Sequence, residues 1–520
     1  MTDTPTMGTM LHRAAANFGD NEALVFGTRS VTYRQLDRRV NQLSNALQAH
    51  GVSKGGIVVV LAKNHPEFLE AHYACARLGA VLCPVNYRLA AREVAEILNS
   101  LHVQVLMLDR DHVSWFRDAI APSLESTAYP VVCFGESTDT GLSYEAFIKP
   151  GRSAEPNPPY PVDSSDAVVM LHTSGTSGLP KGALISQAST VWCGIADMRH
   201  FPWSRDDRLL QSMPFMHVGG LHMLTTAALY QGIPVVIQPQ WDAEEAVETI
   251  SRNRCSALWL QERILDDLVE VAAERPAKVA SLKKLMTAAG PGSSEFVDSV
   301  MRTLALDEIR YMYGLTEAAG TVSMTDSTED LVGRPGNMGR PVFFEDIRLI
   351  DESGSPVAVG EPGELLLRGP NVFLGYHGMA DATEAALQDG WLRTGDLIRM
   401  DDDGCLFFVD RKKDMVKSGG ENVFPADVEP RLLAVNPSLT DLAIVGVPSP
   451  EWGEEVVAFA VVRPGATCSD AEIRERGRTV LGGFKLPKRV IFLEEIPRTP
   501  VGRKVRRAEL RELALRTKPS

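Results

Sequence analysis

The stretch IVVVLAKNHPEFLEAHYACARLGAVLCPV, residues 57–85, decides the class of fold. It begins with an apolar, β-branched run at 57–62, continues with an amphipathic pattern of helical period at 66–78, and ends with a second apolar run at 80–85. A helix between two such runs carries the chain back to the edge of a sheet where a parallel strand begins. The stretch therefore predicts a βαβ unit of a parallel sheet.

The same alternation continues along most of the chain. Further apolar runs predict strands at 103–108, 129–134, 233–239 and 258–260. These repeats indicate an α/β fold with a mostly parallel, doubly wound sheet.

The character of the sequence changes after about residue 340. Short runs separated by Gly and Asp predict hairpins of a small β-rich subdomain at 346–351, 363–369 and 405–411. A compact α+β unit follows, with expected strands at 442–448 and 456–462. We place the domain boundary at Asp410–Lys413, which gives an N-terminal domain of residues 1–410 and a C-terminal domain of residues 411–520.

Size and charge limit the possible functions. A chain of 520 residues is too long for one ordinary core, so two or more domains are expected. The 53 basic and 67 acidic side chains give a net charge of −14, which favours solubility and argues against nucleic-acid binding. From residue 481 onward, 11 basic against 4 acidic residues make the tail locally about +7. Such a tail is either a solvated face or a site for an anionic ligand.

The cysteines and the apolar runs indicate the compartment. Seven scattered cysteines, an odd number without metal-ligand spacing, predict buried free thiols in a reducing compartment. The N-terminal stretch lacks the pattern of a signal peptide, and no apolar run approaches about 20 residues. We expect a soluble, cytoplasmic protein that does not span a membrane.

The loop HTSGTSGLPKG, residues 172–182, has the composition of a phosphate site. Its glycines allow a close approach of the backbone, and its hydroxyls and Lys181 add donors for anionic oxygens. It is not the P-loop of NTPases, because Lys181 is followed by Gly182 rather than by Ser or Thr. A flexible linker is the alternative, but the apolar strand before the loop and PKGALI after it favour polyphosphate binding.

Seven motifs in order carry a resemblance to a known family: TSGTSGLPKG (173–182), MPFMHVGG (213–220), AAGPG (288–292), YGLTE (313–317), GWLRTGD (390–396), DRKKDMVKSGGENVFP (410–425) and PRTPVGRK (497–504). Over nearly its whole length the chain resembles the adenylate-forming superfamily. This superfamily includes acyl-CoA synthetases, aryl-CoA ligases, luciferases and peptide-synthetase adenylation domains. The resemblance implies a large N-terminal domain of stacked α/β sheets and a small, mobile C-terminal domain.

The resemblance also implies the residues that bind ATP and Mg²⁺. The β- and γ-phosphates would be held by Thr173, Ser174, Gly175, Thr176, Ser177, Gly178 and Lys181. Thr316 would contact the α-phosphate, and Glu317 would hold Mg²⁺. The adenosine would lie against Ala289, Gly290, Pro291, Tyr313 and Gly314. Asp396 would accept hydrogen bonds from the ribose, and Arg411 would add a ribose or phosphate contact.

Two further regions would serve the two half-reactions. By resemblance, Lys413 is the pivot about which the small domain rotates after adenylation. Adenylation would need Lys504 from the basic tail, and the thiol transfer would bring in a face formed by Lys417, Ser418, Gly419 and Gly420 with a path for CoA. The family pattern has Gly-Lys in the tail, whereas Arg503 separates Gly502 from Lys504 here. We assign the role to Lys504 and keep Arg503 as the alternative, because an arginine fork does not replace an ammonium group.

The acid site has weaker signals. His217 matches the family position at the pocket mouth, and the residues expected to line the pocket with it are Val218, Met223, Trp259 and Gln261. Gln261, Glu262 and Arg263 are unusual beside an apolar acid, so they either pair with one another near the surface or bind a polar substituent. Gln187 replaces a histidine or similar residue of the family and is expected to have a structural role.

The hypothesis from the sequence is an ATP-dependent acid–CoA ligase that activates a medium-chain or aryl carboxylic acid as its acyl-adenylate. Two alternatives stay open. One is a stand-alone adenylation enzyme that loads an acyl-carrier protein. The other activates an unusual nucleophile such as nitrite, as a diazotase does. The sequence leaves the identity of the acid undetermined, and it leaves open a homodimer.

Overall fold

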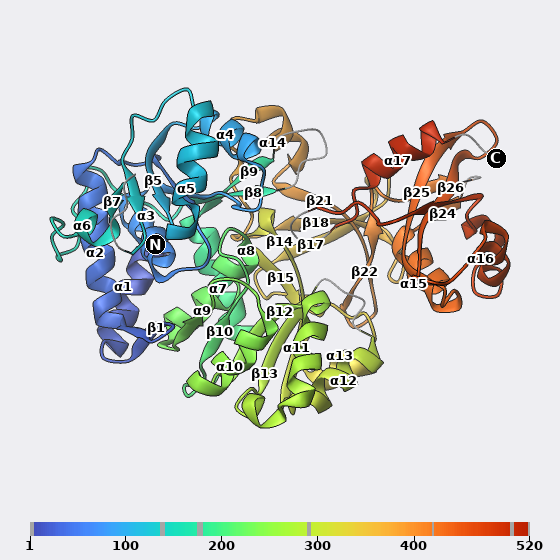
Figure 1. Ribbon diagram of the computed structural model, residues 1–520, viewed down its shortest axis with the longest axis horizontal. Helices are drawn as coiled ribbons and strands as arrows, with labels where there is room; N and C mark the ends of the chain where they lie inside the picture. The colour runs from blue at the N-terminus through green and yellow to red at the C-terminus, as the bar shows by residue number, and fades with distance from the viewer. Residues whose placement is uncertain are drawn as a thin grey trace. The chain divides into compact units, whose positions relative to one another are not determined.

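The computed structural model describes residues 5–135, 141–173, 180–288, 293–418, 421–499 and 504–517, without the side chain of Arg263. The chain divides into two compact units (Figure 1). Unit 1 consists of Met1–Ile347, Leu367–Leu392 and Gly404–Leu406, and unit 2 of Arg348–Leu366, Arg393–Asp403 and Phe407–Ser520. The domain boundary expected at Asp410–Lys413 stays a prediction.

One sheet of unit 1 contains the stretch that opened the sequence, and its strand order is β19-β9-β8-β4-β3-β5-β6-β7. Strand β3 pairs in parallel with β4 on one side and with β5 on the other, so the predicted βαβ unit is present. Strand β9 turns back antiparallel on β8. The bounds are β3 Ile57–Leu61, β4 Val81–Pro84, β5 Val103–Leu108, β6 Val131–Cys133, β7 Leu142–Ser143, β8 Ala167–Thr173, β9 Lys181–Ser186 and β19 Gly375–Tyr376.

The second sheet of unit 1 has the order β16-β15-β14-β13-β12-β10-β11-β1-β2. Its central strands β10 to β14 are parallel, and the strands at both edges are antiparallel. Figure 1 shows helices α10 and α11 beside β12 and β13. The bounds are β1 Glu22–Phe26, β2 Arg29–Thr32, β10 Leu209–Gln211, β11 Val235–Ile237, β12 Ala257–Gln261, β13 Lys284–Ala288, β14 Glu308–Leu315, β15 Gly320–Met324 and β16 Arg340–Pro341.

The remaining strands form two smaller sheets. One has the order β17-β18-β21-β20 with β22 on β21, and the other has the order β24-β23-β26-β25 with β27 on β26. The bounds are β17 Asp346–Ile350, β18 Gly363–Arg368, β20 Leu387–Gln388, β21 Trp391–Met400, β22 Leu406–Arg411, β23 Val416–Ser418, β24 Glu421–Val423, β25 Leu439–Ser449, β26 Gly453–Val462 and β27 Arg489–Leu493.

The α-helices are α1 Met7–Phe18, α2 Tyr33–Ala49, α3 Pro66–Leu78, α4 Ala91–Asn99, α5 Val113–Trp115, α6 Tyr144–Ile148, α7 Gln187–His200, α8 Val218–Leu221, α9 Thr225–Gln231, α10 Ala243–Asn253, α11 Glu262–Glu274, α12 Ser294–Leu304, α13 Thr328–Gly333, α14 Ala380–Ala386, α15 Pro425–Val435, α16 Asp470–Gly477 and α17 Arg507–Arg516. Shorter helical turns are Arg110–His112, Phe116–Ile120, Ala121–Ser123, Pro276–Val279, Thr316–Ala318 and Gly483–Lys485. No helix of the described ranges is long and apolar enough to cross a bilayer.

Helix α3 corrects one expectation from the sequence. Its pattern predicted an amphipathic helix, but every residue of α3 is buried, because strands β4 and β8 lie on one side and helices α1 and α2 on the other. Its acidic side chains are paired, as buried charges must be: Arg39 Nε lies 2.7 Å from Glu70 Oε1, and the Tyr144 hydroxyl donates to Glu70 Oε2 over 2.6 Å.

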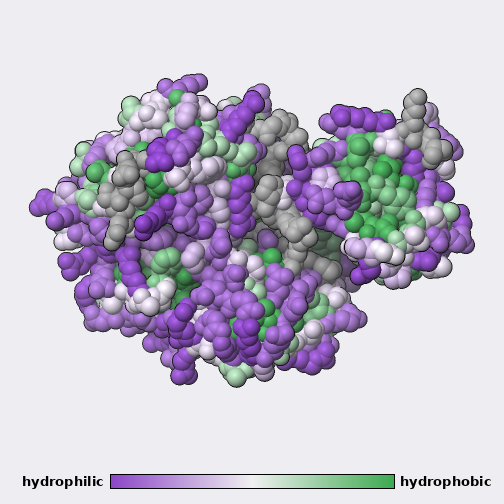
Figure 2. All heavy atoms as spheres, viewed as in Figure 1, coloured by the Kyte–Doolittle hydropathy of each residue, from purple (hydrophilic) through white to green (hydrophobic). Residues whose placement is uncertain are grey.

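The sheet of β25 and β26 in unit 2 is covered on both faces. Residues Ile444, Val456 and Ala458 belong to one apolar cluster, whereas Val445 and Phe459 belong to the other. The two clusters follow the alternation of side chains along a strand. Apolar side chains gather over these strands in Figure 2.

The cysteines agree with the expectation of free thiols. None of the seven, all of which fall in described parts of the chain, forms a disulfide, and six are buried.

Candidate active site

The phosphate loop predicted from the sequence leaves β8 and returns as β9. Thr173 and Lys181 lie opposite each other at the ends of these antiparallel strands, and Thr173 Oγ1 donates to the Lys181 carbonyl over 3.5 Å. The two ends of the loop are thus held together where β8 ends and β9 begins. Five of the predicted phosphate ligands lie outside the described residues, as do three residues of the adenosine face: Ser174, Gly175, Thr176, Ser177, Gly178, Ala289, Gly290 and Pro291.

A chain of three side chains joins this loop to the YGLTE motif. Lys181 Nζ lies 5.0 Å from the centre of the Tyr376 ring, and the Tyr376 hydroxyl donates to Glu317 Oε1 over 2.8 Å. Burial, aided by the Glu317 carboxylate, raises the pKa of Tyr376, so this hydroxyl stays protonated and remains a donor. Tyr376 of the short strand β19 thus contacts both the ammonium group of Lys181 and the carboxylate of Glu317.

The backbone at the YGLTE motif is closely packed. Gly314 lies so near β15 that a Cβ there would be 2.1 Å from the Gly320 carbonyl oxygen, so no larger residue fits. Thr316 and Glu317 then form a short 3₁₀ turn that ends at Ala319, whose φ is +55°. The Phe373 amide donates to the Glu317 carbonyl over 2.8 Å, which fixes the turn against the segment before β19. Tyr313 is buried beside it.

In unit 2, Asp396 and Arg411 lie on neighbouring strands. Arg411 Nε is 3.2 Å from Asp396 Oδ1, and the Asp396 carboxylate is almost fully buried. The Lys412 amide donates to the Gly395 carbonyl over 2.9 Å, and Gly395 has a φ of +69°, which favours glycine. A carboxylate held by a half-exposed arginine can accept hydrogen bonds from a diol.

The other predicted residues of unit 2 lie in its C-terminal part. Lys417 forms an ion pair with Glu352, and Ser418 is buried at the end of β23, whereas Gly419 and Gly420 are outside the described residues. The Arg511 guanidinium donates to the Lys413 carbonyl over 3.0 Å.

Lys504 is exposed, and its backbone is fixed. Its amide donates to the Thr499 hydroxyl over 3.0 Å, and the Thr499 amide donates to the Lys504 carbonyl over 2.8 Å. Val505 packs against an apolar cluster of unit 2, so Lys504 is the outward residue of the pair. Arg503 is not among the described residues.

The residues expected at the acid site lie on two elements of unit 1. His217, Val218 and Met223 belong to the segment that follows β10, and the Trp259 indole N–H donates to the Gly219 carbonyl of this segment over 2.6 Å. Gln261 ends β12. We call residues 212–225 the acid-site segment.

Glu262 differs from one of the two interpretations of the QER stretch, that its side chains pair with one another near the surface. Glu262 is buried and accepts a hydrogen bond from the Tyr311 hydroxyl over 3.0 Å. The physical reason is that Glu262, the first residue of helix α11, meets the phenol of Tyr311 in strand β14, which supplies a donor for the buried carboxylate. The side chain of Arg263 is outside what the structure describes.

Comparison with known proteins gives the family. The model of the AMP-binding enzyme family matches residues 11–377, and the model of the AMP-binding enzyme C-terminal domain matches residues 429–503. The chain belongs to the AMP-binding enzyme family. The resemblance to the adenylate-forming superfamily is thereby confirmed.

The relatives of this AMP-binding enzyme are CoA ligases. The chain is 35% identical over 498 residues to an indoleacetate–CoA ligase of Aromatoleum aromaticum, covering 95% of each chain. It is 33% identical over 490 residues to a feruloyl-CoA synthase of an Amycolatopsis species, covering 94% of this chain and 95% of the relative. The solved structure of an anthranilate CoA ligase with anthranoyl-AMP superposes with a TM-score of 0.85 at 24% identity and covers 99% of each chain. That likeness confirms the α/β fold with a large N-terminal and a small C-terminal domain.

Two features of this AMP-binding enzyme were missed in the sequence. Tyr376 was not among the expected residues, although the GY pair in NVFLGYHG, a glycine before an aromatic residue at a short strand, was available as a signal. The ion pairs of the basic tail were also missed: several of its charges pair with carboxylates of unit 2, including Arg489 with Glu455 and Arg507 with Glu429.

Proposed function

We propose that this enzyme is an ATP-dependent acid–CoA ligase for a medium-chain or aryl carboxylic acid. A carboxylate oxygen attacks the α-phosphorus of ATP, and the bond to the β-phosphate oxygen breaks, which gives the acyl-adenylate and pyrophosphate. The CoA thiol then attacks the acyl carbon, AMP leaves, and the thiol proton is released. The names of the relatives, which act on indoleacetate and ferulate, support an aryl acid.

The observation that carries the proposal is the chain of contacts Lys181–Tyr376–Glu317 at the end of the β8–β9 hairpin. Attack on a polyanion is limited by charge repulsion and by positioning, so fixed cations and donors lower the barrier most. Lys181 would neutralise phosphate oxygens, and Thr173 and Thr316 would donate to them. Tyr376 holds Glu317 in place between the nucleotide and the sheet.

The residues fit a Mg²⁺ ion of the kind that nucleotides bring. Mg²⁺ prefers one or two carboxylates together with phosphate oxygens and waters, rather than a cage of protein ligands. Glu317 provides such a carboxylate, and one of its oxygens is oriented by the Tyr376 hydroxyl. When bound, the ion would draw charge from the phosphate oxygens.

In unit 2, we assign Asp396 to the ribose and Arg411 to a ribose or phosphate contact. Lys504 would reach the α-phosphate during adenylation, and Lys413 would be the pivot between the two half-reactions. Lys417, Ser418, Gly419 and Gly420 would line the path of CoA. The site for the acid would be formed by His217, Val218, Met223, Trp259 and Gln261.

Replacement of Asp396 by alanine is expected to raise the KM for ATP roughly tenfold to hundredfold, because a charge-assisted hydrogen bond contributes about 1.5–3 kcal/mol. The KM for the acid should change little. Steady-state kinetics with each substrate varied in turn measures both values. Asp401→Ala is the matched control, since Asp401 follows the same strand and is not assigned to the nucleotide. An unchanged KM for ATP in Asp396→Ala would contradict the ribose contact.

The proposal is tested with a panel of medium-chain fatty, arylacetic, cinnamic and benzoic acids. Acid-dependent exchange between ATP and pyrophosphate measures adenylation, and mass spectrometry with CoA measures the thioester. We expect exchange and a CoA thioester with at least one aryl or medium-chain acid. Exchange without a thioester would instead indicate a carrier-protein thiol or another acceptor, and an absence of exchange with every acid would overturn the proposal.

A further inference from the structure

The acid-site segment is a loop with little regular structure of its own. Its helical parts among the described residues are the short α8 and Thr225, the first residue of α9, and Leu224 has a φ of +56°, a positive value that a bulky side chain adopts only when its surroundings impose it. The shape of this segment must therefore be imposed by neighbours. Trp259 contacts its middle, Gln211 contacts Met213 and Thr225, and two further buried polar side chains contact its two ends.

Asn64 holds the beginning of the segment. Its Nδ2 donates to the Met213 carbonyl over 2.9 Å and to the Gln238 carbonyl over 3.1 Å, and its Oδ1 accepts from the Phe215 amide over 2.7 Å. Its own amide donates to the Pro239 carbonyl over 2.9 Å. Asn64 is 2% exposed, so these bonds are shielded from water. The side chain ties the loop after β3, in one sheet, to the loops after β10 and β11, in the other.

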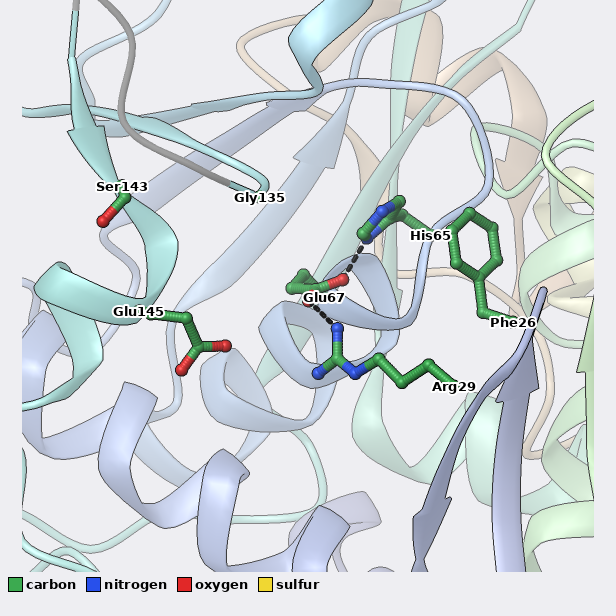
Figure 3. A pocket seen from close by; sticks show the side chains of 7 residues that line it. All are labelled: Phe26, Arg29, His65, Glu67, Gly135, Ser143 and Glu145. Atoms are coloured by element: carbon green, nitrogen blue, oxygen red, sulfur yellow. Dashed lines mark hydrogen bonds and ion pairs between the residues drawn. The ribbon is translucent and has the colours of Figure 1, made fainter.

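The loop that carries Asn64 is itself fixed. Figure 3 shows His65 joined to Glu67 and Glu67 joined to Arg29, and these side chains line a cavity of about 560 Å³. The His65 ring also stacks on Phe134, with ring centres 5.3 Å apart. This network holds the backbone next to Asn64 against strand β2 and helix α3.

Asp197 of helix α7 holds the end of the segment. Its Oδ2 accepts from the Leu224 amide over 3.1 Å, and its Oδ1 accepts from the Thr321 hydroxyl of β15 over 2.7 Å. The side chain is fully buried, and its partners are an amide and a hydroxyl rather than a cation. It thus stabilises the positive φ of Leu224 and sets the separation between the segment and β15. A Cβ at Gly320, next to Thr321, would already lie 3.2 Å from Met223 Cγ, so this separation is small.

We propose that Asn64 and Asp197 are positioning residues of the acid site: they clamp the two ends of residues 212–225 and thereby fix His217, Val218 and Met223. The proposal rests on the assignment of these three residues to the acid. It makes the acid preference of the enzyme depend on two side chains that do not touch the acid.

Asn64→Ala and Asp197→Ala are expected to raise the KM for the preferred acid roughly tenfold or more, because each leaves buried donors or acceptors of the segment without a partner. The KM for ATP should change less than about twofold, and the preference among acids of the panel should become weaker. Asp197→Asn should restore the wild-type preference, since its amide oxygen can accept from Leu224 and its amide nitrogen can donate to Thr321.

The matched control is Gln187→Ala. Gln187 is also a buried amide of unit 1, with its Oε1 accepting from the Met7 amide and its Nε2 donating to the Ala76 carbonyl, and neither of these bonds goes to residues 212–225. Gln187→Ala should lower the melting temperature as the test variants do and leave the acid preference unchanged. Equal rises in both KM values for Asn64→Ala and Asp197→Ala, or the same profile in all three alanine variants, would overturn the inference. An absence of acid-dependent exchange in the wild type would instead overturn the proposed function.

A pH experiment tests the role of Asp197 even if the alanine variants fail to fold. Burial raises the pKa of Asp197 from 3.8 to about 7, although the hydrogen bonds from Thr321 and Leu224 act in the opposite direction. Cys193 on the same helix and Tyr230 near it are neutral neighbours, because burial raises the pKa of both. Between these two pH values the folded state binds more protons than the unfolded state, so this group lowers the free energy of unfolding as pH rises. In Asp197→Asn this decrease in the free energy of unfolding is absent, because the amide does not titrate.

From pH 5 to pH 8, the melting temperature of the wild type should therefore fall by several degrees relative to that of Asp197→Asn. The KM for the acid should change with pH through about 7 in the wild type and stay level in Asp197→Asn, because the amide has no proton to lose in this range. Parallel pH profiles for the two proteins, in both measurements, would contradict the role of Asp197.

Discussion

Lys504→Ala is expected to lower the rate of acyl-adenylate formation by about 10²–10³-fold, the usual effect of removing one fixed group that stabilises transition-state charge. The ammonium group would neutralise the charge that develops on the α-phosphate. Thioester formation from supplied acyl-adenylate and CoA should be largely unaffected, because the α-phosphate bond is already made. Single-turnover assays of each half-reaction measure the two rates.

Three results decide the assignment of the tail residue. Arg506→Ala is the matched control, since Arg506 is exposed two positions away and pairs with Glu509. It should leave both rates close to those of the wild type. If Arg503→Ala loses adenylation and Lys504→Ala does not, the role belongs to Arg503. Equal loss of both half-reactions in Lys504→Ala would remove the specific role in adenylation.

The second large effect is expected for Glu317→Gln. The amide keeps the shape of the side chain but loses the charge that Mg²⁺ prefers, so adenylation should fall by about 10²–10³-fold at ordinary Mg²⁺ concentrations. Excess Mg²⁺ should restore part of the rate, because the phosphate oxygens still bind the ion. Exchange between ATP and pyrophosphate over a Mg²⁺ titration measures the shift.

Tyr376→Phe is the companion variant. It removes the hydroxyl that donates to Glu317 and keeps the ring beside Lys181, so a smaller loss, about tenfold, is expected. A Glu317→Gln enzyme with the Mg²⁺ dependence of the wild type would contradict the metal assignment. A Tyr376→Phe enzyme as impaired as Glu317→Gln would mean that Tyr376 acts on more than the carboxylate.

The strands were predictable because their burial leaves a local signal. The run at 103–108 coincides with β5, and the runs at 57–62 and 346–351 differ from β3 and β17 by one residue. Parallel strands covered on both faces are continuously apolar, and this pattern does not depend on distant parts of the chain. Helix α3 was misjudged because its Glu67 and Glu70 look like solvent-facing residues until Arg29 and Arg39, which pair with them, are placed in space.

The candidate site was predictable only where one motif supplied the residue. Thr173, Lys181 and Glu317 were singled out from motifs, and the structure brings Lys181 and Glu317 to the same tyrosine. Tyr376 and Asn64 were missed because their importance comes from contacts with segments far away in the chain. The buried position of Glu262 was missed because its partner, Tyr311, is 49 positions away.

A crystal structure with Mg²⁺ and an ATP analogue that has a methylene group between its α- and β-phosphorus atoms tests the central claim most directly. We expect the triphosphate to lie along residues 173–181, with Lys181 Nζ within about 3 Å of a phosphate oxygen and Mg²⁺ bound to Glu317. A triphosphate bound elsewhere, with Glu317 away from the metal ion, would contradict the central claim.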